Sequence, residues 1–204
     1  MYLFYSYPAR MLAGVVSVIA IVSLAMQTMA NVERGVSLVA GWSAMLRFFT
    51  IWGVIGSAII FSRIALRGRI EPHLPFALVT ALVIIAGVYH LLLASAHHPE
   101  GLDWWTNIAH HTLVPGGSVL WWLLFSFDRL TGLRSLPIAI LFPLIYGAFA
   151  LINGNITGFY PYFFLDRNTL GLTEVLTNML WLAILFMLVA AVLLGLRNVI
   201  RGRV

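Results

Sequence analysis

Hydrophobic residues fall into long runs separated by short polar stretches, a pattern that predicts helices crossing a membrane. A run of about 20 apolar residues forms a helix long enough to cross a hydrocarbon core of about 30 Å. We predict six such spans, at residues 11–30, 43–66, 75–95, 110–127, 136–152 and 173–196. Because the connections are short, neighbouring helices should pack antiparallel. The pattern therefore predicts an all-α polytopic membrane protein in which residues 1–204 form a single six-helix domain.

The composition narrows the class further. Of the 204 residues, 61% are hydrophobic and 9% are charged, which excludes an ordinary soluble domain. There is no cysteine, so disulfides, thiolate nucleophiles and sulfur-ligated metals are excluded. The net charge of +5 comes entirely from arginine, since the sequence contains no lysine. In a membrane protein such an excess indicates topology, and we expect no nucleic-acid partner.

The distribution of arginine predicts the orientation. With six spans, the two termini share one side with the second-to-third and fourth-to-fifth connections, and that side holds nine arginines against three on the other. Arginine accumulates on the cytoplasmic side, so both termini should be cytoplasmic. Aromatic residues should form belts at the two surfaces. The outer belt comprises Trp104, Trp105, Tyr160 and Tyr162, and the inner one Tyr2, Tyr5, Tyr7, Trp121 and Trp122.

Polar side chains within or next to the spans gather near their outer ends. Those that we single out are Arg47, Thr50, His90, Asn107, His110, His111 and Asn178. Thr50 is expected about 10 Å along the second span, with Arg47 one turn nearer the water. The inner half is almost purely apolar. This sorting predicts a polar, hydrated pocket that opens outward.

A hydroxyl and an imidazole at one depth permit nucleophilic catalysis. Histidine can take the proton of a threonine hydroxyl near neutral pH, which makes the oxygen a nucleophile. Thr50 and His111 lie on the second and fourth spans and could meet across the bundle. We therefore predict a Thr–His dyad that attacks an ester carbonyl and passes through an acyl-threonine. His90, Asn107 and His110 are the candidates for orienting the base or stabilising the oxyanion.

Two further residues are expected to support the substrate or the bundle. Arg47 could bind the carboxylate of a fatty acid whose chain lies among the helices. Asn178 could assist from the sixth span. Simpler roles exist, because a membrane threonine such as Thr50 often bonds its own helix, Asn107 could be a helix N-cap, and Arg47 could extend to the headgroups.

Three short motifs carry a resemblance to a known family. They are Arg47-Phe48-Phe49-Thr50, the stretch from Asn107 to Thr112 followed by Pro115, and residues 158–166. In this order they resemble the bacterial branch of the androgen-induced-gene family, multi-pass membrane proteins whose animal members hydrolyse fatty acid esters of hydroxy fatty acids. The resemblance implies that Thr50 is the nucleophile, that His111 is the base, and that no cofactor or metal is needed. Gly53 and Val54 stand where bacterial members often carry small polar residues.

Two other classes fit part of the pattern. A haem or metal protein could use the clustered histidines, which are His90, His97, His98, His110 and His111. They crowd one leaflet, however, and no HExxH arrangement occurs. A transporter is disfavoured because no repeat and no polar path to the cytoplasm are visible, whereas a non-enzymatic lipid-binding protein fits the composition. The favoured reading is a hydrolase whose partners are a fatty-ester substrate and membrane lipids.

Overall fold

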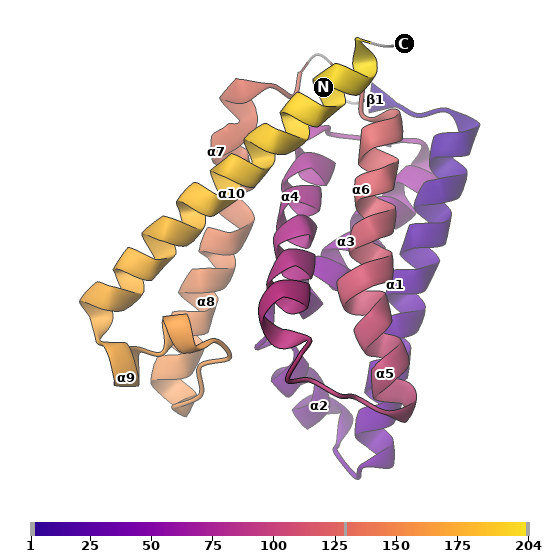
Figure 1. The fold of residues 1–204 in the computed structure, drawn as a ribbon. Coiled ribbons are helices and arrows are strands. Elements are labelled where there is room, and N and C mark those ends of the chain that lie inside the picture. The colour runs from indigo at the N-terminus through magenta and orange to yellow at the C-terminus, as the bar shows by residue number, and fades with distance from the viewer. Residues whose placement is uncertain (1–2, 129, 203–204) are drawn as a thin grey trace.

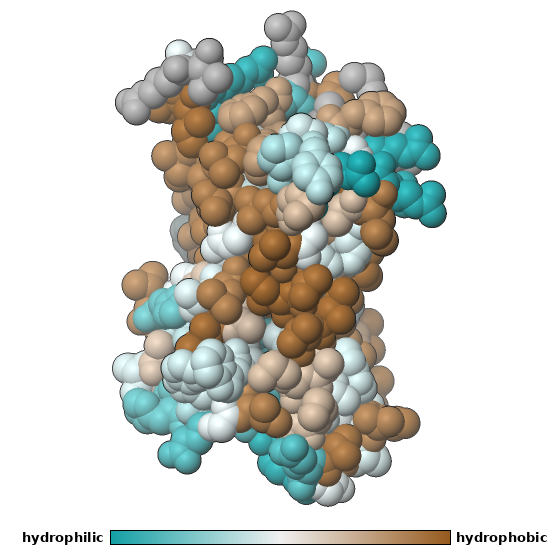
Figure 2. All heavy atoms as spheres, turned by 90° about the vertical axis from the view of Figure 1, so that its right-hand side faces the viewer, coloured by the Kyte–Doolittle hydropathy of each residue, from teal (hydrophilic) through white to brown (hydrophobic). Residues whose placement is uncertain are grey.

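The computed structural model describes residues 3–128 and 130–202, and almost all of their secondary structure is helical. Among these residues, five helical segments are long and apolar enough to cross a membrane, namely Tyr7–Glu33, Phe49–Arg67, His73–Leu93, Leu133–Thr157 and Leu172–Arg201. Figure 2 shows a face whose middle is covered by hydrophobic side chains, with hydrophilic ones at both ends. The all-α prediction is confirmed, and these segments support a multi-pass membrane protein.

Four helical segments form a bundle in the first 125 residues (Figure 1). Helix α1 packs on α3 and α6, and α4 packs on the same two helices. Gly53 lets α3 approach α4 closely, because a Cβ there would lie 2.6 Å from Cδ1 of Ile85. The segments are α1 (Tyr7–Glu33), α3 (Phe49–Arg67), α4 (His73–Val88) extended by the π-helical turn η1 (Tyr89–Leu93), and a helix over residues 101–125.

The helix over residues 101–125 differs from the predicted fourth span. It consists of α5 (Gly101–Ile108), the π-helical turn η2 (Ala109–Leu113) and α6 (Val114–Phe125), so it starts nine residues before position 110. Its apolar residues are interrupted by two histidines, a proline and two glycines. It is not one of the five candidate spans in the described part of the chain.

The predicted second span is wrong in its first part. Helix α2 (Leu38–Met45) ends before Arg47, and α3 begins at Phe49 after the extended residue Phe48. The indole of Trp52 donates to the backbone oxygen of Leu46 at 2.8 Å, which satisfies a carbonyl freed by the break. Thr50 consequently lies in the first turn of α3 and not about 10 Å along a continuous helix. The hydrophobic pattern of residues 43–66 gives no sign of this break, because the polar groups that it frees are satisfied by contacts that form only in the folded protein.

The C-terminal segments form a helical hairpin beside α4 (Figure 1). Helices α7, α8 and α10 all contact α4. The start of α1 and the end of α10 lie at one end of the molecule, and α2, α5 and α9 lie at the other (Figure 1). The hairpin comprises the 3-10 turn η3 (Leu133–Ser135), α7 (Leu136–Ala139), α8 (Leu141–Thr157), the 3-10 turn η4 (Phe163–Leu165), α9 (Arg167–Leu170) and α10 (Leu172–Arg201).

A buried ion pair, absent from the sequence prediction, fastens α10 to the bundle. Arg197 is 3% exposed, and its Nη1 lies 3.5 Å from Oδ2 of Asp128. Its Nη2 donates to the backbone oxygen of Thr131 at 2.6 Å. Arg197 lies just beyond the predicted end of the sixth span at residue 196, but α10 continues to Arg201 and carries the guanidinium inward.

The aromatic residues Trp121 and Trp122 also lie inside the bundle, which contradicts an inner belt. Both are 0% exposed. Trp121 donates from Nε1 to the backbone oxygen of Ala9 at 2.8 Å, and Trp122 stacks on Phe76 with ring centroids 5.8 Å apart. Because α6 has α1 on one side and α4 on the other, two adjacent residues are both covered. Nearby, the short strands β1 (Leu3–Phe4) and β2 (Arg69–Ile70) pair antiparallel.

Candidate active site

Two π-helical turns face each other near one end of the bundle. One is η1 at the end of α4 and the other is η2 between α5 and α6. The rings of Tyr89 and His111 stack with centroids 3.9 Å apart, and Nε2 of His90 lies 3.0 Å from Oγ1 of Thr112. A π-helical turn inside an α-helix is rare and occurs frequently at functional sites. Because two such turns lie side by side, this level of the bundle is a candidate functional site.

The hydroxyl of Thr50 lies beside this pair of turns. Its Oγ1 is 3.5 Å from Nε2 of His111, and both side chains are half-buried. The structure thus brings together the two side chains of the predicted dyad, from α3 and from the helix over residues 101–125. The distance is long for a hydrogen bond, but such contacts commonly shorten when substrate binds.

Asn107 determines which ring nitrogen of His111 carries the proton. Nδ1 lies 2.9 Å from Oδ1 of Asn107 and 3.1 Å from its backbone oxygen. A backbone carbonyl only accepts, so Nδ1 must donate. In the neutral imidazole Nε2 then holds a lone pair, and this nitrogen faces Thr50. The amide of Asn107 is itself fixed, because its Nδ2 donates to the hydroxyl of Tyr89 at 2.6 Å.

The other candidate supports do not contact His111 through a hydrogen bond among the described residues. His90 is exposed and pairs with Thr112. His110 is 4% exposed, and its Nε2 has no hydrogen-bond partner in the described part of the chain. Asn107 lies inside α5 and is not an N-cap. Of the three candidates, only Asn107 forms a hydrogen bond with His111 within the described part of the chain.

Arg47 and Asn178 lie outside this group. The guanidinium carbon of Arg47 lies 5.2 Å from the centroid of the Phe159 ring, and its buried Nε has no hydrogen-bond partner among the described residues. Asn178 donates from Nδ2 to the backbone oxygen of Phe164 at 3.0 Å, so it ties the loop between α8 and α10 to α10. Asn178 therefore fastens a loop, while Arg47 presents a cation near the start of α3.

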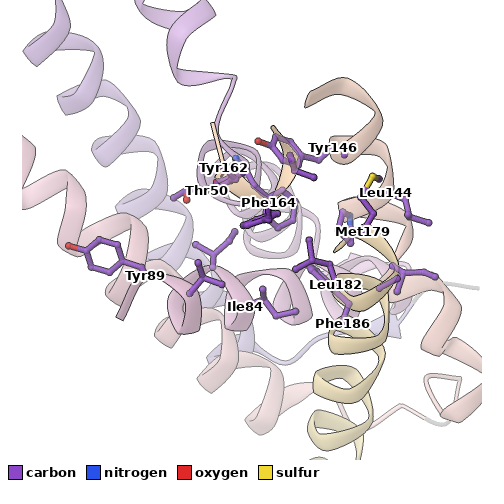
Figure 3. Close-up of a pocket in the computed structure, with 18 of the residues that line it drawn as sticks. Thr50, Ile84, Tyr89, Leu144, Tyr146, Tyr162, Phe164, Met179, Leu182 and Phe186 are labelled. Atoms are coloured by element: carbon purple, nitrogen blue, oxygen red, sulfur yellow. Dashed lines mark hydrogen bonds between the residues drawn. The ribbon is translucent and has the colours of Figure 1, made fainter. Parts of the chain in front are cut away.

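Thr50 lines an apolar cavity between the bundle and the hairpin (Figure 3). The bundle contributes Phe49, Ile84 and Tyr89, and the hairpin contributes the opposite wall. His111 lies behind Thr50 and Tyr89 and does not line the cavity. The hairpin residues labelled in Figure 3 are Leu144, Tyr146, Tyr162, Phe164, Met179, Leu182 and Phe186.

The cavity beside Thr50 is therefore apolar, unlike the polar, hydrated pocket predicted from the sequence. The polar side chains share a depth but point in different directions around their helices, so most of them miss this cavity. A second, polar pocket lies on the other side of Tyr89. It is lined by Tyr89, His97, His98, Pro99, Glu100, Trp104 and Asn107. Tyr89 separates the two spaces.

Two tyrosines at the site were missed or misplaced by the sequence. Tyr89 was missed because no sequence motif around it points to a functional role. Tyr162 was expected in an outer belt, but the backbone N–H of Phe49 donates to its hydroxyl oxygen at 3.1 Å. Burial raises the pKa of Tyr162, while hydrogen bonds from Phe49 and Thr50 partly oppose this rise. The sequence signal that could have identified Tyr162 is its place in the motif at residues 158–166.

No family model, no curated protein and no solved structure matches this chain. Within the described residues, no three histidine or carboxylate side chains converge as a zinc site requires.

Proposed function

We propose that this protein is an intramembrane hydrolase of lipid esters, with Thr50 as the nucleophile and His111 as the general base. The observation that carries the proposal is the unprotonated Nε2 of His111, which faces the Thr50 hydroxyl at the wall of an apolar cavity. Asn107 holds the imidazole in the tautomer that a base requires.

The reaction proceeds in two halves. The Thr50 oxygen forms a bond to the ester carbonyl carbon while its proton moves to Nε2 of His111, and the carbonyl electron pair moves onto oxygen. The tetrahedral intermediate collapses, the bond to the alkoxy oxygen breaks, and His111 returns the proton to the departing alcohol. Water then attacks the acyl-threonine with the same base and releases the fatty acid.

The cavity favours a substrate with a long acyl chain. Its lining is hydrocarbon and aromatic apart from Thr50 and three tyrosine hydroxyls, so an alkyl chain can fill it without leaving polar groups unpaired. The cation of Arg47 suits a carboxylate, as in a fatty acid ester of a hydroxy fatty acid. That substrate class also follows from the family resemblance of the three motifs.

In this proposal the chain spans a bacterial inner membrane six times, with the predicted fourth span, residues 110–127, added to the five candidate segments. Both termini face the cytoplasm, on the arginine-rich side, and the active site lies toward the outer leaflet. The cavity between helices then opens to lipid, so an ester dissolved in the membrane can reach Thr50 without crossing water.

Labelling with a fluorophosphonate probe, which phosphonylates activated serine and threonine hydroxyls, tests the proposal. We expect wild-type protein to be labelled at Thr50 and to hydrolyse a long-chain fatty ester. Thr50→Ala should abolish both, and His111→Ala should reduce both by about 10³-fold or more, as for other nucleophile–base pairs.

Matched controls are Thr177→Ala, whose hydroxyl donates to Thr173 of its own helix, and His73→Ala at the far end of α4. Both should keep wild-type labelling. Wild-type protein that is neither labelled nor hydrolytic would contradict the proposal, and tight fatty-acid binding in that protein would indicate a lipid-binding function instead.

A further inference from the structure

Few polar groups line the cavity, and most of their protons are committed. Besides Thr50, the lining hydroxyls belong to Tyr89, Tyr146 and Tyr162. Tyr146 donates its proton to the backbone oxygen of Arg47 at 2.6 Å. The hydroxyl of Tyr89 is directed away from the other lining residues (Figure 3). Tyr162 is the remaining donor beside Thr50.

The hydroxyl of Tyr162 sits at the first turn of α3. Its oxygen accepts from the N–H of Phe49 at 3.1 Å, and it also interacts with the amide and hydroxyl of Thr50. Since this oxygen accepts from the N–H of Phe49, its own O–H remains available as a donor on the side of Thr50, the cavity and the neighbouring hydroxyl of Tyr146. Thr50 and Tyr162 lie beside each other at one end of the cavity (Figure 3).

The ring of Tyr162 is held firmly in place. It stacks on Phe164 with centroids 5.3 Å apart and rings 8° from parallel. The backbone of Phe164 is in turn bonded by Asn178 of α10. Two residues earlier in the same loop, Tyr160 packs against Gly154 of α8, where any Cβ would collide with the tyrosine ring. A donor fixed before reaction needs no reorganisation when charge develops.

We propose that Tyr162 is a catalytic residue that donates a hydrogen bond to the oxyanion formed when Thr50 attacks the ester. The inference rests on the proposed function and names the donor that the dyad lacks. When the carbonyl electron pair moves onto oxygen, the O–H of Tyr162 binds it without transferring its proton. The donor is released when the carbonyl re-forms and the alcohol leaves.

Burial supports the donor role, because it raises the pKa of Tyr162 and keeps the phenol protonated near neutral pH. A structural role competes with this one. Phe48 occupies the N-cap position of α3 and offers no side-chain acceptor, so the oxygen of Tyr162 also caps that helix. The test must separate donation to substrate from capping.

Tyr162→Phe removes only the hydroxyl. We expect kcat for a long-chain ester to fall by about 10²- to 10³-fold, as for loss of one oxyanion donor, with KM within about threefold of wild type. Tyr160→Phe is the matched control, because that buried hydroxyl has no hydrogen-bond partner among the described residues. It should leave kcat unchanged.

A long-chain trifluoromethyl ketone distinguishes the two roles, because Thr50 would add to it and form a bound oxyanion. We expect Tyr162→Phe to weaken its inhibition by the same factor as kcat/KM, while the affinity for the fatty-acid product is unchanged. In a second variant, Phe48→Ser combined with Tyr162→Phe, the new cap should restore thermal stability but not kcat.

Unchanged ketone inhibition alongside a reduced kcat would overturn the inference and leave Tyr162 as a cap, with the proposed function intact. Recovery of kcat in the Phe48→Ser double variant would overturn it in the same way. A wild-type protein that the fluorophosphonate does not label would instead overturn the proposed function, and this inference with it.

Discussion

The four-helix bundle and the C-terminal hairpin are both strongly apolar but differ in how much of their surface is buried. In the best apolar window of α4, 50% of the residues are buried, against 22% in α10. Large residues such as Leu188 and Val192 of α10 are 59% and 61% exposed, whereas Leu82 of α4 is 0% exposed. The same composition therefore serves two purposes, which are core packing in the bundle and contact with lipid in the hairpin.

The difference also divides the proposed reaction between the two regions. Thr50, Asn107 and His111 all stand on helices of the bundle, where close packing holds their geometry. The hairpin and its loop supply the far wall of the cavity and the phenol of Tyr162. We infer that the bundle holds the nucleophile and its base, while the more loosely packed hairpin supplies the oxyanion donor and determines which substrate fits.

Few polar contacts join the two regions. At the active-site end, Tyr146 donates to Arg47 and Phe49 donates to Tyr162. At the opposite end, Arg197 meets Asp128. The helices have little hydrophobic reason to associate in lipid, so such contacts and close packing must hold the hairpin in place.

The largest effect is expected from Asp128→Asn, which leaves the guanidinium of Arg197 buried without its counter-charge. Breaking one partner of a buried pair costs about 3–5 kcal/mol, so the free energy of unfolding in mixed SDS micelles should fall by that amount. Asp166→Asn is the control, because Asp166 caps α9 in an exposed turn and asparagine caps equally well.

Limited proteolysis should show the hairpin of the Asp128→Asn protein cleaved before the bundle. Replacing both partners, as in Asp128→Leu with Arg197→Met, should recover much of the lost stability. Equal losses in the Asp128→Asn and Asp166→Asn proteins would show that the ion pair does not fasten α10.

A leucine pair compares the packing of the two regions directly. Leu82→Ala opens a cavity in the bundle and should lower the free energy of unfolding by about 2–5 kcal/mol. Leu188→Ala on the lipid-facing side of α10 should cost less than about 1 kcal/mol, because lipid replaces the lost methyl groups. Similar costs for both, measured by SDS unfolding, would contradict the difference in packing.

Asn107→Ala should lower kcat for ester hydrolysis by about 10²-fold, because His111 loses the acceptor that fixes its tautomer and ring orientation. Stability should change little, since the side chain is only half-buried. Asn155→Ala, at an exposed position near the end of α8, is the matched control and should retain full activity. Activity retained in Asn107→Ala would remove this residue from the mechanism.

The smallest effect concerns Asp103, whose carboxylate pairs with Arg34 outside the spans. The hydrogen bond from Arg34 lowers the pKa of Asp103 below its usual value of about 4. A lowered folded-state pKa adds stability at higher pH, which disappears as the pH falls through that pKa. Asp103→Asn should therefore cost less than about 1 kcal/mol at pH 7, since the pair is largely solvated, and progressively less across the acid range in which the Asp103 carboxylate takes up its proton. A constant cost across this range would contradict the pairing.

The hydrophobic pattern by itself determined much of this protein. It predicted an all-α chain, the approximate position of every long helix, and the alternation of their directions. It also singled out Thr50 and His111, because a polar side chain in an apolar run is conspicuous and helix length gives its depth.

Tertiary structure alone decided where those side chains point and what they contact. Helices that are apolar on nearly every side carry no pattern that reveals which face meets a neighbour. The break before Phe49, the inward turn of Tyr162, the burial of Arg197 and the apolar nature of the cavity all depend on contacts between residues far apart in sequence. Depth along a helix follows from counting residues, whereas direction around it is set by packing.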